Sequence, residues 1–284
     1  MTASARPRTL DPVRPFAFSQ SALEDYKECR RRFQLRYIEG VRWPAPRALP
    51  IEEAERLMER GARFHRMAQQ ALVGVPLERL EEIAADSGDA DLVTWWRGFA
   101  ALLPTLEAAR RYVEVGLAAP LGRHRLVARY DLILLEESGR AVIYDWKTSQ
   151  RRPRPTSLAN RLQSRIYPAL LALAGNALNG GTPIAPQSIE MVYWFSADPA
   201  HPERTVYSPE RFEQDLAELQ ALTGEIERLG AEDFEMTADE QACRFCTFRS
   251  LCARGPAGRV SEWEAEFDPA GPDLDLDQTA EIRF

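Results

Sequence analysis

The sequence of 284 residues predicts one mixed domain of helices and strands, of the α/β or α+β class. Three observations lead to this prediction. Up to about Ala109, apolar residues recur with a helical period. From Tyr112 the period changes to 2, which is typical of strands. Helical and strand patterns then alternate until a cysteine-rich segment. Because 45% of the residues are hydrophobic, the chain can form one large core.

The first helix is expected to begin at the sequence Ser21-Ala22-Leu23-Glu24, which fits a capping box. Its apolar pattern continues to about Tyr37. Cys29 lies on the apolar stripe of this helix, between Tyr26 and Phe33. The sequence therefore predicts one continuous N-terminal helix with a cysteine on its buried side.

A second helix, over residues 51–72, has a histidine on its apolar stripe. Further helical patterns lie at 77–85 and 92–109. A histidine on such a stripe is usually a core residue with a satisfied hydrogen bond. Near a pair of carboxylates it becomes a third ligand for the same metal ion. The stripe consists of Ala54, Met58, Gly61, His65, Ala68 and Leu72.

Three strands are predicted next, at 112–117, 125–135 and 141–147. The last two are joined by Glu137-Ser138-Gly139, a plausible three-residue hairpin loop in which glycine supplies a positive φ. A symmetric hairpin centred on Ser138 places Asp131 opposite Asp145.

Pro153 and Pro155 interrupt the chain after these strands. A helix is expected at 157–174, a further strand at 188–196, and a helix from Ser208-Pro209 to about Leu229.

The net charge of −7 argues against a protein that is basic over its whole surface, although a local basic groove along a phosphate backbone remains compatible with it. The sequence has no signal peptide and no apolar run long enough for a membrane span, so we expect a soluble cytoplasmic protein without a membrane partner. The arginines cluster, either as a phosphate-binding track or as ordinary charged surface: Arg30, Arg31, Arg32 and Arg36 in one segment, and Arg151, Arg152, Arg154, Arg161 and Arg165 in another.

Two acidic residues and a lysine lie on the predicted hairpin strands. Asp131 and Asp145 stand in apolar segments, where two carboxylates repel each other unless a cation lies between them. Carboxylate oxygens suit Mg²⁺ or Mn²⁺. Lys147 shares a strand face with Asp145 and is one of only two lysines in the chain, with Lys27. The alternative is a pair of surface acids with Lys147 as a salt-bridge partner.

Gln163 and Tyr167 stand four residues apart on the next predicted helix and project from one face. In one interpretation, Gln163 and Tyr167 contact a nucleic-acid substrate, and Arg161 and Arg165 contact the flanking phosphates. A polar helix edge with a packed tyrosine explains the same spacing.

Four cysteines form a group of three plus one. Cys243, Cys246 and Cys252 lie close together in the sequence, whereas Cys29 is far upstream. A cytoplasmic protein is expected to use them for a metal rather than for disulfides. The three-plus-one layout favours a four-thiolate [4Fe–4S] cluster over zinc or unligated thiols.

These residues, in this order, resemble the RecB-like branch of the PD-(D/E)xK nuclease superfamily. The cysteine layout is similar to that of its iron–sulfur members, among them CRISPR-associated exonucleases and AddB-type nuclease domains. The matching motifs span residues 19–252. They are Ser21-x-Leu23-x-x-Tyr26-x-x-Cys29, Gly61-x-x-x-His65, Tyr130-Asp131, Asp145-x-Lys147, Gln163-x-x-x-Tyr167 and the final three cysteines.

The resemblance implies a restriction-endonuclease-like mixed central sheet flanked by helices, with an N-terminal helical lobe and a C-terminal cysteine closure. It implies that Lys147 is catalytic and that Gln163 and Tyr167 contact the substrate. The implied ligands are His65, Asp131, Asp145 and the Trp146 carbonyl for Mg²⁺ or Mn²⁺, and Cys29, Cys243, Cys246 and Cys252 for a [4Fe–4S] cluster. The sequence departs from the family at Arg30, where a proline often follows the first cysteine, and at Asp145, where many members have glutamate.

The implied function is that of a metal-dependent DNA nuclease, acting as an exonuclease on single strands in recombination, repair or CRISPR-type processing, with a helicase or CRISPR integrase as a potential partner. The alternative is a non-catalytic, cluster-bearing subunit that binds DNA or assembles such a complex. An unrelated zinc-bound structural protein is a third interpretation. The nuclease domain is expected at 16–258, followed by a flexible acidic tail at 259–284.

Overall fold

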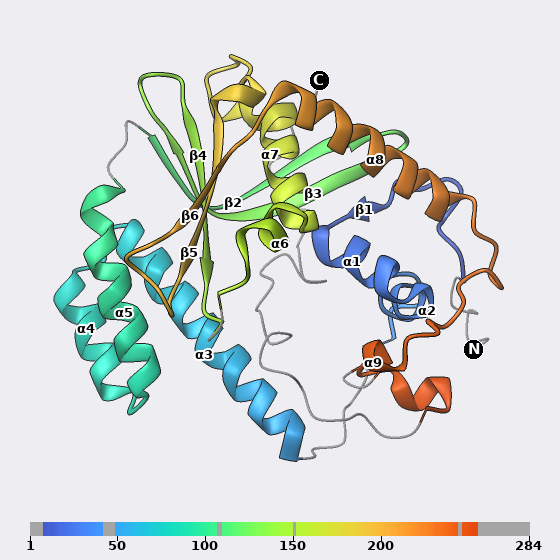
Figure 1. The fold of residues 1–284 in the computed structure, drawn as a ribbon, viewed down its shortest axis with the longest axis horizontal. Helices are drawn as coiled ribbons and strands as arrows, with labels where there is room; N and C mark the ends of the chain where they lie inside the picture. Colours follow the sequence, from blue (N-terminus) through green and yellow to red (C-terminus); the bar gives the residue numbers. More distant parts are fainter. Residues whose placement is uncertain (1–7, 42–48, 107–109, 150–151, 244–245, 255–284) are drawn as a thin grey trace, which may run out of the picture.

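A mixed sheet of six strands is covered by helices on both faces (Figure 1). The computed structural model describes residues 8–41, 49–106, 110–149, 152–243 and 246–254. The strands are β1 (Ala17–Phe18), β2 (Arg110–Leu121), β3 (His124–Leu135), β4 (Ala141–Lys147), β5 (Ile189–Phe195) and β6 (Glu203–Val206). The predicted mixed class of helices and strands is confirmed.

Helices precede, interrupt and follow the sheet. The longer α-helices are α1 (Gln20–Glu28), α3 (Leu49–Leu72), α4 (Leu77–Asp86), α5 (Ala90–Leu102), α7 (Leu162–Ala174) and α8 (Pro209–Glu227). The shorter ones are α2 (Arg30–Phe33), α6 (Pro155–Ala159) and α9 (Glu240–Cys243). Four 3₁₀-helical turns of the described chain are η2 (Leu103–Thr105), η3 (Gly175–Ala177), η4 (Pro186–Ser188) and η5 (Arg249–Cys252), and η1 (Gln34–Ile38) is a π-helical turn.

β3 is the central strand of the sheet. It pairs with β2, which is antiparallel to it, from His124 to Leu135 with a gap at Asp131. Its other edge pairs with β1 near residues 125–126, in parallel, and with β4 from Leu132 onward, antiparallel. β4 and β5 then run parallel, and β6 closes the sheet beyond β5. The partner of this second edge therefore changes from β1 to β4 just before Leu132.

Two hydrophobic cores lie on opposite faces of the sheet. One is formed by α1, α7 and α8 against residues such as Ile133, Ile143 and Tyr193. The other is formed by α3, α4 and α5 against Leu132, Tyr144 and similar residues. Figure 1 shows α3, α4 and α5 together on one side and α7 and α8 on the other. Because neighbouring residues of β4 enter different cores, this strand is apolar on both faces, as expected for an interior strand.

The β3–β4 hairpin has the predicted loop and register. Gly139 has a φ of 84°, and the paired residues include Leu132 with Tyr144 and Leu135 with Ala141. Continuing this register by one step places Asp131 opposite Asp145, as the sequence predicted.

The N-terminal helix differs from the prediction in its start and in its continuity. The N-cap is Ser19, whose hydroxyl accepts a hydrogen bond from the Ala22 amide, so the capping box at Ser21 is wrong by two residues. The helix also breaks at Cys29, which has an extended backbone with φ −158° and ψ 108°. α2 and the π-helical turn η1 follow the break. Cys29 therefore lies at a junction between helices rather than on a continuous helical stripe.

Other differences are smaller. β1 and β6 were not predicted, because two and four residues give too little periodicity to recognise. The helix expected at 157–174 is divided into α6 and α7. α5 ends at Leu102, two residues before Pro104, which disfavours continuation of a helix. Met58 is exposed, although the predicted stripe of its helix included it. The helix start at Ser208 is confirmed by its hydrogen bond from the Arg211 amide.

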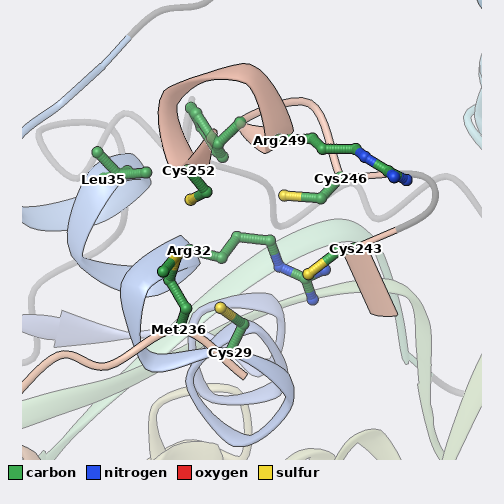
Figure 2. A pocket seen from close by; sticks show the side chains of 9 residues that line it. Cys29, Arg32, Leu35, Met236, Cys243, Cys246, Arg249 and Cys252 are labelled. Atoms are coloured by element: carbon green, nitrogen blue, oxygen red, sulfur yellow. The ribbon is translucent and has the colours of Figure 1, made fainter. Parts of the chain in front are cut away.

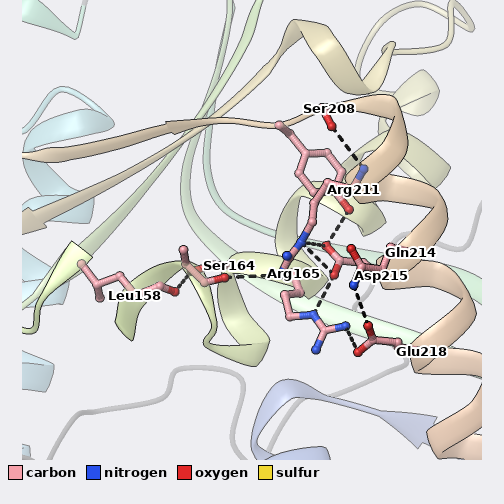
Figure 3. Close-up of polar contacts among 10 residues, drawn as sticks. Leu158, Ser164, Arg165, Ser208, Arg211, Gln214, Asp215 and Glu218 are labelled. Carbon is pink, nitrogen blue, oxygen red and sulfur yellow. Dashed lines mark hydrogen bonds and ion pairs between the residues drawn. The ribbon is translucent and has the colours of Figure 1, made fainter. Parts of the chain in front are cut away.

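A buried acidic residue joins α7 to α8 (Figure 3). Asp215 on α8 has no exposed surface. It accepts hydrogen bonds from Arg165 of α7 at 2.7 Å, from Tyr207 at 3.0 Å and from Arg211 at 3.1 Å. Arg165 also pairs with Glu218. This network fixes α7 on one face of the sheet.

We predict that Asp215→Ala lowers the free energy of unfolding by about 3 kcal/mol, because it leaves Arg165 largely buried without its main partner. The matched control is Glu213→Ala, an exposed position on the same helix, which should change the stability by no more than about 0.5 kcal/mol. Urea denaturation measures both values. Equal stabilities of the two variants would contradict this role for Asp215.

Candidate active site

Asp131, Asp145 and Lys147 lie together at the end of the β3–β4 hairpin. All three are buried, with exposed fractions of 2%, 4% and 6%. Nζ of Lys147 is 3.0 Å from Oδ2 of Asp145. The sequence analysis left open that Asp131 and Asp145 are surface acids with Lys147 as a salt-bridge partner. Because all three residues are buried, they are not surface residues.

Asp131 links the hairpin to α3. Its Oδ2 accepts a hydrogen bond of 2.7 Å from the Trp146 amide. This bond follows directly after the last backbone pair of the ladder, between Leu132 and Tyr144. Its Oδ1 is buried and accepts no hydrogen bond from the described residues, and Nδ1 of His65 lies 3.3 Å from it. The carboxylate is therefore oriented with one oxygen toward the histidine.

His65 reaches this point from the buried side of α3, where Phe64 and Ala68 enter one of the two cores. Burial is the largest single influence and would lower the pKa of His65. The contact with Asp131 and the negative charges of Asp131, Asp145 and Glu114 together outweigh it, so the pKa is raised above its usual value. The structure thus brings together His65 and Asp131, two of the three protein side chains predicted to hold a metal ion.

Asp145 is held from two sides. Gln163 of α7 donates a hydrogen bond to its Oδ1, and Lys147 pairs with its Oδ2. Nζ of Lys147 also lies 5.8 Å from the centre of the Tyr193 ring. Burial, and next the charge of Asp145, raise the pKa of Tyr193, whose hydroxyl is 2.7 Å from that of Ser164. These contacts fix the position of the lysine ammonium.

Glu114 also belongs to this site, and the sequence analysis did not identify it. Its carboxylate lies with the ligand atoms of His65 and Asp131, all within 4.8 Å of one another. Among the described residues this is the group that fits a metal ion by that spacing, and Asp145 is outside it. Burial, and next the charge of Asp131, raise the pKa of Glu114 to about 7. A signal existed in the sequence: Glu114 is a single acid between Val113 and Val115 in an apolar strand.

The donor set fits a divalent cation. It offers one imidazole nitrogen and two carboxylates in a buried position, where the negative charges destabilise each other without a cation. Oxygen and imidazole donors of this kind suit Mg²⁺ or Mn²⁺.

Tyr167 is packed inside the protein. Only 1% of it is exposed, its ring centre lies 4.8 Å from that of Tyr130, and its carbonyl accepts a hydrogen bond from the Tyr130 hydroxyl. Gln163 is also buried, with 3% exposed. Their predicted contact with substrate stays a prediction.

Several arginines of the two clusters pair with acidic residues. Arg165 pairs with Asp215 and Glu218, and its predicted contact with a phosphate stays a prediction. α8, distant in sequence, packs on α7 and supplies these acids. Other pairs are Arg30 with Glu225, Arg31 with Glu39, Arg32 and Arg36 with Asp25, and Arg152 with Asp198 and Glu203. Arg151 lies outside the described residues.

The four cysteines line one pocket, as Figure 2 shows. Cys29 enters it from the junction between α1 and α2, and the other three come from α9, η5 and the segment between them. Arg32 and Phe248 also line the pocket. Burial raises the pKa of Cys246 and of Cys252. The break in the N-terminal helix therefore brings Cys29 to the closing segment of the domain.

The four sulfur atoms are grouped less closely than the ligand atoms of His65, Glu114 and Asp131. No three of them, all in described residues, lie within 4.8 Å of one another.

Comparison with known proteins identifies the family. Residues 17–253 match the family described as the PD-(D/E)XK nuclease superfamily. The chain belongs to this superfamily. Its mixed sheet between helices is therefore the restriction-endonuclease-like fold that the resemblance implied. Membership implies a nuclease that hydrolyses phosphodiester bonds with a divalent metal and binds DNA. No curated protein matches the sequence.

Two solved structures are similar in fold. A protein named SSO0001 is 13% identical over 88% of this chain and 90% of its own, with a TM-score of 0.43. A candidate exonuclease from Eubacterium rectale is 11% identical over 89% of this chain and 92% of its own, with a TM-score of 0.48.

No helix in the described part of the chain has the length and apolar composition needed to cross a membrane.

Proposed function

We propose that this chain is a Mg²⁺- or Mn²⁺-dependent deoxyribonuclease that acts as an exonuclease on single-stranded DNA. The observation that carries the proposal is the buried grouping of His65, Asp131, Asp145 and Lys147 at the end of one hairpin. Such a grouping is costly for stability, because it buries charges that repel each other. It is therefore better explained by catalysis than by folding.

The residues have distinct proposed roles. His65, Asp131, Asp145 and the Trp146 carbonyl would hold the divalent ion. When bound, the ion supplies a polarised phosphate and a water of lowered pKa. The reaction would be hydrolysis: a water oxygen would bond to phosphorus, the bond to the leaving sugar oxygen would break, and a proton from the water would pass to that oxygen.

Lys147 is proposed to stabilise the charge that develops on the phosphate. Its ammonium is already oriented by Asp145 and by the ring of Tyr193. Gln163 of α7 donates a hydrogen bond to Asp145, and this contact supports a position of α7 beside the reacting phosphate. Tyr167 lies four residues further along the same helix, and we propose that both residues support contact with the substrate.

The proposed nuclease domain covers residues 16–258 and is followed by an acidic tail at 259–284. Residues 255–284 lie outside the described part of the chain. Action in the cytoplasm, in recombination, repair or CRISPR-type processing with a helicase or integrase partner, is the context we propose from the family resemblance.

Replacement of Lys147 tests this function. Lys147→Ala should reduce cleavage of end-labelled single-stranded DNA in Mn²⁺ by about 10²–10³-fold, because the charge on the phosphate loses its stabilising cation. The matched control is Lys27→Ala, which removes the only other lysine, an exposed one, and should cleave like the wild type.

Labels at the 5′ and 3′ ends give the direction of digestion. A folded wild-type protein that binds DNA but does not cleave it would support the alternative, a non-catalytic subunit. Equal cleavage by Lys147→Ala and the wild type would contradict the proposed role of the lysine.

We also propose that Cys29, Cys243, Cys246 and Cys252 hold a [4Fe–4S] cluster. Three observations support this. No three of the sulfurs lie within 4.8 Å of one another, whereas a tetrahedral zinc ion with Zn–S bonds of about 2.3 Å holds its sulfurs about 3.8 Å apart. Burial raises the pKa of Cys246 and of Cys252 and so disfavours free thiolates there, whereas a bound metal group would stabilise the deprotonated sulfurs. Arg254 donates a hydrogen bond of 2.9 Å to Sγ of Cys243, which favours a negatively charged sulfur.

Analysis of anaerobically purified protein tests the cluster. We expect about four iron and four sulfide ions per chain, and Cys29→Ser should lose iron and lower the melting temperature, because the cluster connects distant parts of the chain. Stoichiometric zinc without sulfide in the wild-type protein would contradict the assignment.

A further inference from the structure

Glu114 has no role in the proposed function as stated so far, yet it is the acid most closely grouped with His65 and Asp131. It lies on β2, between two valines. Its side chain is only 11% exposed. A carboxylate in such a position needs a specific reason to be there.

The backbone at Glu114 is unusual. Its φ is 51°, in the left-handed region, and it lies inside a strand. Residues other than glycine seldom adopt this conformation, and where they do the surrounding structure maintains it, often at functional sites. The neighbouring pairs are Val113 with Leu132 and Val115 with Tyr130. Glu114 therefore lies opposite Asp131, at a gap in the β2–β3 ladder.

Both strands change faces at this gap. On β3, Tyr130 enters the core beneath α7, whereas Leu132 enters the core beneath α3. On β2, Val115 packs against the core beneath α7, whereas Val113 packs against the core beneath α3. Without the irregular residue, each of these pairs would share one face, because side chains alternate along a strand. The switch leaves two carboxylates side by side, facing His65.

The charges around Glu114 are not balanced by protein groups alone. Arg129 pairs with Glu114, at 2.9 Å from Nε to Oε2, but its own side chain is 40% exposed. Lys147 is engaged with Asp145. Oδ1 of Asp131 is buried and accepts no hydrogen bond from the described residues. This oxygen is therefore available to a cation between Asp131 and Glu114.

We propose that Glu114 is a further metal ligand, so that a divalent cation binds between His65, Glu114 and Asp131. Asp145, whose two oxygens contact Gln163 and Lys147, then borders this ion from the side of the lysine. The proposal rests on the proposed function and adds a residue to its site. The competing explanation is that Glu114 serves only as an ion-pair partner of Arg129.

The test is Mn²⁺ binding by the full-length protein. Binding is measured from the electron paramagnetic resonance signal of free Mn²⁺, and the melting temperature is measured separately. Glu114→Gln keeps the shape of the side chain and an oxygen that can accept from Arg129. We expect it to lower the Mn²⁺ affinity by about tenfold or more. It should raise the melting temperature without metal, because a charge that repels Asp131 is removed.

Two variants serve as controls. Glu190→Gln changes a buried strand glutamate that pairs with Arg140 and Arg204, outside the site. It should bind Mn²⁺ like the wild type. It should lower the melting temperature, whereas Glu114→Gln is expected to raise it. Arg129→Gln should also keep the wild-type affinity.

The proposal is overturned if Glu114→Gln binds Mn²⁺ like the wild type, or if Arg129→Gln loses as much affinity as Glu114→Gln. The variant His65→Ala separates this outcome from failure of the proposed function. If His65→Ala loses Mn²⁺ while Glu114→Gln does not, the metal site stands and only the role of Glu114 is wrong. A wild-type protein that binds no Mn²⁺ overturns both.

Discussion

The mutual repulsion of buried carboxylates is the constraint on which this structure depends. Glu114, Asp131 and Asp145 place three carboxyl groups in the interior, where water screens charges poorly and like charges repel each other. Lys147 balances one of them directly. The folded protein maintains this arrangement only because two large cores and several ion pairs stabilise the rest of the domain. A bound divalent cation would stabilise the folded domain, because it binds the folded state and reduces this repulsion.

The fold imposes the arrangement through three contacts. The β3–β4 hairpin fixes Asp131 relative to Asp145, and the Trp146 amide holds the Asp131 carboxylate. α3 brings His65 from one face of the sheet, and α7 brings Gln163 from the other. α7 is in turn fixed by α8. The site therefore forms only when both faces of the sheet are covered, which explains why its residues are spread through the sequence.

Local patterns predicted most of this from the sequence. The period of 2 identified the hairpin, and its symmetric loop placed Asp131 opposite Asp145, because these are properties of neighbouring residues. The sequence did not predict the break at Cys29, where the chain lies beside a segment more than 200 residues away. Nor did it identify Glu114: a single acid between two valines was the signal for it, but its left-handed backbone leaves no periodic pattern. Nor could it predict the ion pairs of Arg165, because its acidic partners are on a later helix.

The most direct test is crystallography of the wild-type protein grown with Mn²⁺, with anomalous diffraction data to locate the ion. We predict an anomalous peak in contact with the Asp131 carboxylate and the His65 ring, next to Lys147. This result would establish that the buried acids exist to bind a cation. A protein that cleaves DNA in Mn²⁺ while its only bound ion lies away from Asp131 would contradict it.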